Sequence, residues 1–167
     1  GGTVFRIRLP VTEARASAAS DGGEAAFTLS GRLLVVDDEP AIGRYVGEYL
    51  GGEGVAVTAV ASGREAMELL ARGAAFDAVL TDLRMPDVSG DRLIAFIAEN
   101  RPDLSGRVVV MTGDALGPEV NTHASDVPVV VKPLEFRALR AALRPLLGRG
   151  KTDADAGGKA GADQKEN

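Results

Sequence analysis

Four short apolar runs of this chain each end in residues that can do chemistry. The first is followed by the acidic pair Asp37-Asp38 and the second by Asp82, while the third ends in Thr112 and the fourth in Lys132. In an open parallel sheet, the carboxyl ends of the strands share one edge, and ligands bind there. Three carboxylates, a hydroxyl and an ammonium at one edge indicate a site for a divalent cation and a phosphoryl group.

Each of these groups has a role in phosphoryl transfer. A carboxylate with an ordinary pKa is ionised at neutral pH and can attack phosphorus, which is the role expected of Asp82. Three neighbouring carboxylates repel each other and need a hard cation, and oxygen ligands alone favour Mg²⁺. Lys132 would neutralise phosphoryl oxygens and Thr112 would donate a hydrogen bond to one of them, because this chemistry depends on positioning and charge neutralisation.

Strand and helix patterns alternate between these runs. Strands are expected at residues 32–36, 55–60, 78–81, 107–111 and 129–131, and all but the second are almost continuously apolar. Such strands indicate a parallel sheet covered by helices on both faces. The sequence therefore predicts an α/β fold, a doubly wound five-stranded parallel sheet in a single domain.

The helices carry their own start and stop signals. Residues 42, 45, 46, 49 and 50 fall on one face of a first helix, so Tyr45 and Tyr49 are expected to be core packing residues. Gly51-Gly52 ends that helix, and a capping box from Ser62 to Glu65 opens the second one. A third helix is expected around 93–97, a short one near 118–124, and a last one from 136 that ends before Pro145.

Composition divides the chain into four parts. Residues 1–10 read as one amphipathic strand, 11–30 as a linker poor in large apolar groups, 31–147 as the folded domain and 148–167 as a disordered tail. The first residue is Gly rather than Met, which we interpret as the mark of an excised fragment or a processed product.

Charge and composition also narrow the functional class. The net charge of −5 gives no electrostatic reason to expect nucleic-acid binding, and no apolar run is long enough to span a membrane. The absence of cysteine excludes disulfides and thiolate metal sites. These features predict a cytoplasmic protein that binds neither nucleic acid nor a membrane.

The chain resembles the receiver domain of two-component response regulators over residues 31–147. Asp38 and Asp82 are 44 residues apart and Thr112 follows 30 residues later, as in that family, and Met85-Pro86 with Gly90 follows the family's phosphoacceptor pattern. The resemblance implies a flavodoxin-like sheet in the order 2-1-3-4-5.

Residue by residue, the resemblance also implies roles. Asp82 would be the phosphoacceptor, and its phosphoryl group would come from a phosphohistidine on a kinase or phosphotransfer protein. Mg²⁺ would be held by Asp37, Asp38, Asp82 and the backbone carbonyl of Arg84. Thr112 and Lys132 would bind the phosphoryl group.

Residues 1–10 resemble the last glycine box and closing strand of a histidine-kinase ATPase domain. A receiver after a short linker is the arrangement of a hybrid sensor histidine kinase. The fragment itself is expected to have no kinase activity, because no ATP-binding boxes remain, although its parent would be a kinase.

Two other functions remain open from the sequence. A phosphohydrolase of the haloacid-dehalogenase type also attacks with an aspartate, but it needs a second Asp where this chain has Arg84. A receiver-like interaction module that is never phosphorylated is the stronger alternative. Val129 supports it, because many receivers have an aromatic residue there to couple the hydroxyl to the output face. Asp82→Asn separates the receiver from the module, because it should abolish phosphorylation and signalling in a receiver and leave partner binding unchanged in a module.

Overall fold

The structure is a computed structural model that describes residues 28–113 and 127–149. Four predicted features lie wholly or largely outside the described residues: the strand at 1–10, the linker at 11–30 up to residue 27, the helix near 118–124, and the tail beyond residue 149.

The centre of the fold is a parallel sheet in the order β2-β1-β3-β4-β5, which confirms the predicted topology. The three central strands contain runs that are buried on both faces and rich in apolar residues, as expected inside a parallel sheet. The strands are β1 (Leu29–Val36), β2 (Val55–Val60), β3 (Ala78–Asp82), β4 (Val108–Thr112) and β5 (Val129–Val131).

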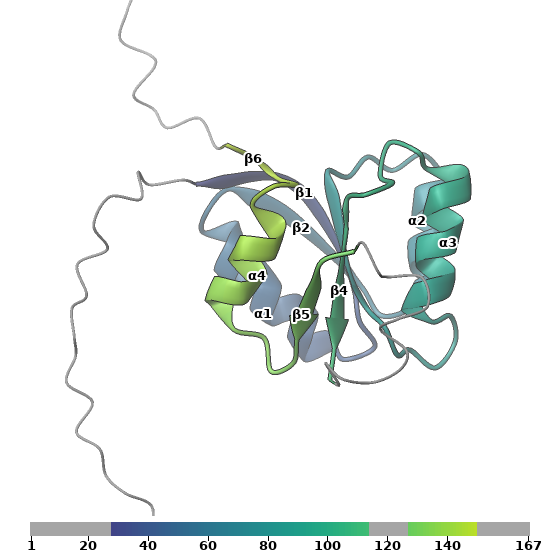
Figure 1. The fold of residues 1–167 in the computed structure, drawn as a ribbon, viewed down its shortest axis with the longest axis horizontal. Coiled ribbons are helices and arrows are strands. Elements are labelled where there is room, and N and C mark those ends of the chain that lie inside the picture. Colours follow the sequence, from purple (N-terminus) through teal and green to yellow (C-terminus); the bar gives the residue numbers. More distant parts are fainter. Residues whose placement is uncertain (1–27, 114–126, 150–167) are drawn as a thin grey trace, which may run out of the picture.

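Helices cover both faces of this sheet (Figure 1). The helices are α1 (Pro40–Gly51), α2 (Gly63–Ala71), α3 (Gly90–Asn100) and α4 (Phe136–Leu143). Alternate residues of β1 point to opposite faces: Leu33 and Val35 pack with α1 and α4, whereas Leu34 and Val36 pack with α2 and α3. Two hydrophobic cores therefore hold the carboxyl ends of the strands in fixed positions.

The helix boundaries follow the signals in the sequence. Ser62 Oγ accepts a hydrogen bond from the Glu65 backbone N–H at 3.1 Å, which confirms the capping residue of α2. The Glu65 carboxylate reaches back to the Ala61 N–H at 3.4 Å, one residue before the position that a capping box usually uses. Helix α1 ends at Gly51 and α4 at Leu143, two residues before Pro145.

The folded unit extends beyond the predicted boundaries at 31 and 147. Strand β1 starts at Leu29, and a two-residue strand, β6 (Gly148–Arg149), pairs with it in antiparallel orientation. The sequence hides this start because Gly31 interrupts the apolar pattern, and its φ of +133° is a conformation that glycine adopts readily. Leu29 nevertheless is fully buried.

The prediction that Tyr45 packs in the core is wrong. Tyr45 is 37% exposed, and its hydroxyl donates a hydrogen bond to the backbone carbonyl of Leu134. Tyr49 is partly buried and packs against the core, as predicted. The reason is that, of the rings that the structure describes, only that of Phe136, the first residue of α4, stacks on the Tyr45 ring, and Phe136 is itself exposed.

Within the described residues, none of the helices combines the length and the apolar character that a membrane span requires.

Candidate functional site

The acidic pair lies at the carboxyl end of β1. The Asp37 N–H donates to the Val60 carbonyl of β2 at 3.2 Å, so the sheet still fixes the backbone there. Its Oδ1 accepts the Glu39 N–H at 2.9 Å. The Asp37 side chain is buried, whereas the Asp38 side chain is exposed.

Asp82 ends β3, the neighbour of β1, and it is buried. Its Oδ1 accepts the Leu83 N–H at 2.9 Å. The loop that follows returns to the same place, because the Gly90 N–H donates to the Leu83 carbonyl at 3.0 Å. A Cβ on Gly90 would lie 2.5 Å from the Asp82 carbonyl oxygen, so the close approach requires glycine.

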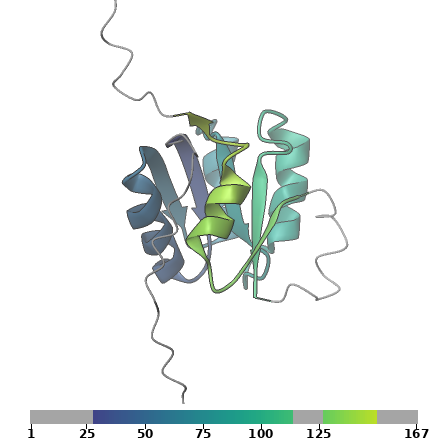
Figure 2. The ribbon, with the colours of Figure 1, turned by 60° about the vertical axis from the view of Figure 1, so that its left-hand side comes forward.

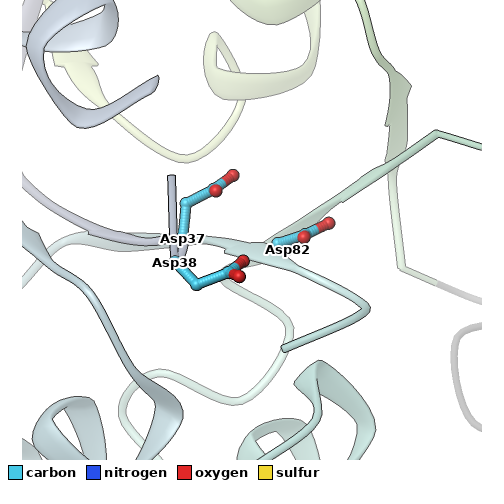
Figure 3. A group of neighbouring side chains, drawn as sticks. All are labelled: Asp37, Asp38 and Asp82. Carbon is cyan, nitrogen blue, oxygen red and sulfur yellow. The ribbon is translucent and has the colours of Figure 1, made fainter. Parts of the chain in front are cut away.

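Figure 3 shows Asp37, Asp38 and Asp82 side by side at the ends of the two strands. One carboxylate oxygen from each lies within 4.8 Å of the others. Lys132, which directly follows β5, places its Nζ 2.8 Å from Asp37 Oδ2 and 3.3 Å from Asp82 Oδ2. The structure thus brings together four of the residues that the sequence singled out.

The electrostatics of the site follow from burial and from these short distances. Burial raises the pKa of Asp82; the ammonium of Lys132 opposes this rise, and the charge of Asp37 adds to it. Burial alone would lower the pKa of Lys132, but its hydrogen bond to Asp37 and the charges of Asp82 and Asp37 together raise it. Lys132 therefore stays charged, while Asp82 binds a proton more readily than an ordinary aspartate does.

Thr112 and Arg84 occupy the flanks of the cluster. Thr112 is the last residue of β4, buried one register position beyond the pairing of Met111 with Asp82, and its carbonyl accepts the Lys132 N–H at 2.7 Å. Arg84 lies in the loop after Asp82, with its side chain exposed. The strand ends thus place both residues at the same edge of the sheet as the carboxylates.

Glu39 is a member of this site that the sequence did not single out. Its Oε1 lies 3.6 Å from Lys132 Nζ, although its side chain is 66% exposed. The only signal in the sequence is its position immediately after the acidic pair. At that exposure the Glu39 contact stabilises the lysine weakly, because solvent screens the ion pair.

The fold and the site together define a class of protein. The response regulator receiver domain family matches residues 33–144, and the chain belongs to that family. It is therefore a receiver domain of two-component signal transduction, as the resemblance implied.

Relatives of two kinds share this domain. The sensor protein TorS of Escherichia coli K12 is 32% identical over 103 residues, which cover 62% of this chain and 11% of TorS. The sensor kinase CckA of Brucella abortus is 29% identical over 158 residues, covering 87% of this chain and 16% of CckA. The transcriptional regulatory protein GlrR of Escherichia coli K12 is 32% identical, with 66% of this chain and 25% of GlrR covered. The matches thus span a quarter or less of the length of these three proteins.

Solved structures agree with the fold. A response regulator receiver protein from Sinorhizobium medicae has a TM-score of 0.62 at 30% identity, covering 70% of this chain and 94% of that one. The Vibrio cholerae chemotaxis protein CheY4 has a TM-score of 0.61 at 26% identity, covering 71% and 99%. The chain is therefore similar to complete receiver domains over its described core.

Proposed function

We propose that Asp82 is the phosphoacceptor of this receiver domain and that it takes its phosphoryl group from a phosphohistidine. The observation that carries this proposal is the cluster itself. A buried carboxylate at a strand end lies 3.3 Å from a lysine ammonium and beside two further carboxylates. No purely structural role requires three carboxylates to gather in this way, because their mutual repulsion costs stability.

The donor set fits Mg²⁺. Carboxylate oxygens of Asp37, Asp38 and Asp82 are hard ligands that lie close enough to share one cation. The backbone carbonyl of Arg84 is the fourth protein ligand that we propose. When bound, Mg²⁺ supplies positive charge that neutralises oxygens of the phosphoryl group.

The chain's own residues then account for the transfer. A carboxylate oxygen of Asp82 forms a bond to phosphorus while the phosphorus–nitrogen bond of the donor breaks. The electron pair of that bond leaves with the donor imidazole, which is released with one ring proton. Lys132 exchanges its contact with Asp82 for one with the phosphoryl oxygens, and the Thr112 hydroxyl donates to another of them.

Phosphorylation would act as a switch. It adds negative charge beside Lys132 and Thr112, and this charge shifts the population between an inactive and an active conformation that differ in their output surface. Val129 occupies the position at which many receivers carry a coupling aromatic residue, so the movement of Thr112 and its loop would carry the signal.

We also propose that the domain belongs to a hybrid sensor histidine kinase in the cytoplasm. The similarity to TorS and CckA supports this origin, as does the character of residues 1–10. Its partners would then be a histidine kinase or a phosphotransfer protein. The receiver domain would accept phosphoryl groups without being a kinase itself.

The proposed site can be tested by amide NMR. Mg²⁺ is expected to shift resonances around Asp38, Asp82 and Arg84, and beryllofluoride, which mimics a phosphoryl group, is expected to extend the shifts to Thr112 and Lys132. The Asp82→Asn variant should lose the beryllofluoride response. A Mg²⁺ response without any beryllofluoride response in the wild type would favour the interaction module instead.

A further inference from the structure

The loop that carries Lys132 is held to α1 at a second point, away from the carboxylates. Two residues after Lys132, the Leu134 carbonyl accepts a hydrogen bond from the Tyr45 hydroxyl at 3.2 Å. Tyr45 lies in the middle of α1, so this bond joins elements that are far apart in the sequence.

Aromatic stacking reinforces the same junction. Phe136, the first residue of α4, stacks on Tyr45 with ring centroids 4.8 Å apart and planes 6° from parallel. It also stacks on Tyr49 at 3.8 Å and 21°. Tyr45 and Tyr49 are one helical turn apart and present neighbouring rings. Figures 1 and 2 show α1 and α4 side by side on the same face of the sheet.

Burial alone does not explain this arrangement. Tyr45 is 37% exposed and Phe136 39%, and with Val131 they are the large apolar side chains classed as exposed among the described residues. A residue that only filled the core would be buried and would not need the hydroxyl. The feature that distinguishes Tyr45 is its polar contact with the loop after Lys132.

Helix α1 and the turn before it contact the segment around Lys132 at two places. Helix α1 starts at Pro40, directly after the acidic turn that contains Asp37, and Asp37 holds the Lys132 ammonium at 2.8 Å. From the middle of α1, Tyr45 contacts Leu134 and Phe136. The backbone on either side of Lys132 is thus fixed, because the Lys132 N–H also donates to the Thr112 carbonyl at 2.7 Å.

We propose that Tyr45 is a positioning residue that orients Lys132 toward the phosphoryl group through the Leu134 carbonyl. This inference rests on the proposed function. A lysine side chain loses much rotamer freedom when it binds one ligand, and a fixed backbone leaves only the side chain to be ordered. Tyr45 therefore lowers the ordering cost when the ammonium moves from Asp82 to phosphoryl oxygens.

The Tyr45→Phe variant tests this role, because it keeps the stacked ring and removes only the hydroxyl. Tyr49→Phe is the matched control: it removes a hydroxyl that has no hydrogen-bond partner in the described part of the chain. The dissociation constants of Mg²⁺, and of beryllofluoride at saturating Mg²⁺, would be measured by NMR on the wild type and both variants. The Cε resonance of Lys132 would be followed in the same samples.

Tyr45→Phe is expected to weaken beryllofluoride binding by roughly threefold to tenfold, the range for one neutral hydrogen bond. The Mg²⁺ constant should stay at the wild-type value, the Lys132 resonance should move, and Tyr49→Phe should match the wild type. Unchanged beryllofluoride affinity in Tyr45→Phe would overturn the inference, as would an equal loss of Mg²⁺ affinity or a loss with no change at Lys132. Failure of the wild type to bind beryllofluoride would instead overturn the proposed function itself.

Discussion

At the scale of single residues, Asp82 is held in an environment that works against its charge. It is buried at the end of β3 with Asp37 nearby, and Lys132 offsets this only in part, so the pKa of Asp82 is raised. A carboxyl whose pKa is higher in the folded state binds protons more tightly there than in the unfolded chain. Its contribution to stability is fully present below the unfolded pKa and is lost as the pH rises through the folded one.

The Asp82→Asn variant should therefore be more stable than the wild type at neutral pH in the presence of EDTA. Asn removes the charge and keeps an oxygen that accepts the Leu83 N–H, so the free energy of unfolding should rise by on the order of 1 kcal/mol. Urea unfolding at pH 7 and at pH 3 measures this, and the difference should shrink at the lower pH. An Asn variant that is less stable than the wild type at pH 7 would contradict the electrostatic account.

Gly90 is the residue whose lack of a side chain lets the loop close behind Asp82. Gly90→Ala would place a methyl group 2.5 Å from the Asp82 carbonyl oxygen. We expect a loss of about 1–3 kcal/mol in the free energy of unfolding together with weaker Mg²⁺ binding, because the backbone of a proposed ligand must shift.

Gly47 provides the control for this substitution. It lies within α1, and an added Cβ would have no neighbour within 4 Å. Gly47→Ala should stabilise the protein by about 0.5–1 kcal/mol, because alanine is the better helix former. Equal effects of the two substitutions in chemical denaturation would show that the close approach at Gly90 has no energetic weight.

At the scale of the elements, α2 and the loop after Asp82 support each other. The Asp87 carboxylate accepts the Arg64 N–H at the start of α2 at 3.3 Å, and a Cβ on Gly63 would lie 2.6 Å from the Val88 carbonyl oxygen. Hydrogen bonds from the Val88 and Arg64 backbones hold the pKa of Asp87 below its usual value. The start of α2 thus helps to fix the loop that contains Arg84.

The cap of α2 gives a direct test of this element. Ser62→Ala removes the acceptor for the Glu65 N–H and should lower the free energy of unfolding by about 1 kcal/mol. Ser89→Ala at the start of α3 is the matched control, because the Ser89 side chain makes no capping hydrogen bond. Thermal unfolding followed by circular dichroism measures both, and a control that loses as much stability would refute the assignment of the cap.

The sequence predicted these elements well because their signals are local. Apolar runs followed by a charged residue identified the strands that precede Asp37 and Lys132, and Ser62 marked a helix start. It missed what depends on distant segments. Strand β6 forms because Gly148 pairs with Ser30 of β1, and a two-residue strand is too short for its sequence to indicate that partner. Periodicity likewise placed Tyr45 on the core face and could not show that α4 begins beside it.

At the scale of the whole molecule, the fold holds three carboxylates that repel one another at one edge of the sheet. The two cores hold β1 and β3 in register, so Asp37, Asp38 and Asp82 cannot separate to relieve their charge. The Mg²⁺ that we propose for this site would reduce the repulsion. The affinity for Mg²⁺ should therefore be coupled to the stability of the entire domain.

Mg²⁺ is expected to raise the unfolding midpoint, and EDTA should lower it again. A ligand that binds only the folded state at a concentration about 100-fold above its dissociation constant adds about 2.7 kcal/mol. Differential scanning calorimetry across a Mg²⁺ series measures the effect. Asp38→Asn should reduce it by weakening binding, and a midpoint independent of Mg²⁺ in the wild type would contradict the proposed metal site.

Acceptance of a phosphoryl group by Asp82 can be measured by intact-protein mass spectrometry after incubation with phosphoramidate. This small donor has a phosphorus–nitrogen bond like that of phosphohistidine. We expect the gain of one phosphoryl group that depends on Mg²⁺ and is absent in Asp82→Asn. No gain in the wild type, or the same gain in Asp82→Asn, would show that Asp82 is not the phosphoacceptor.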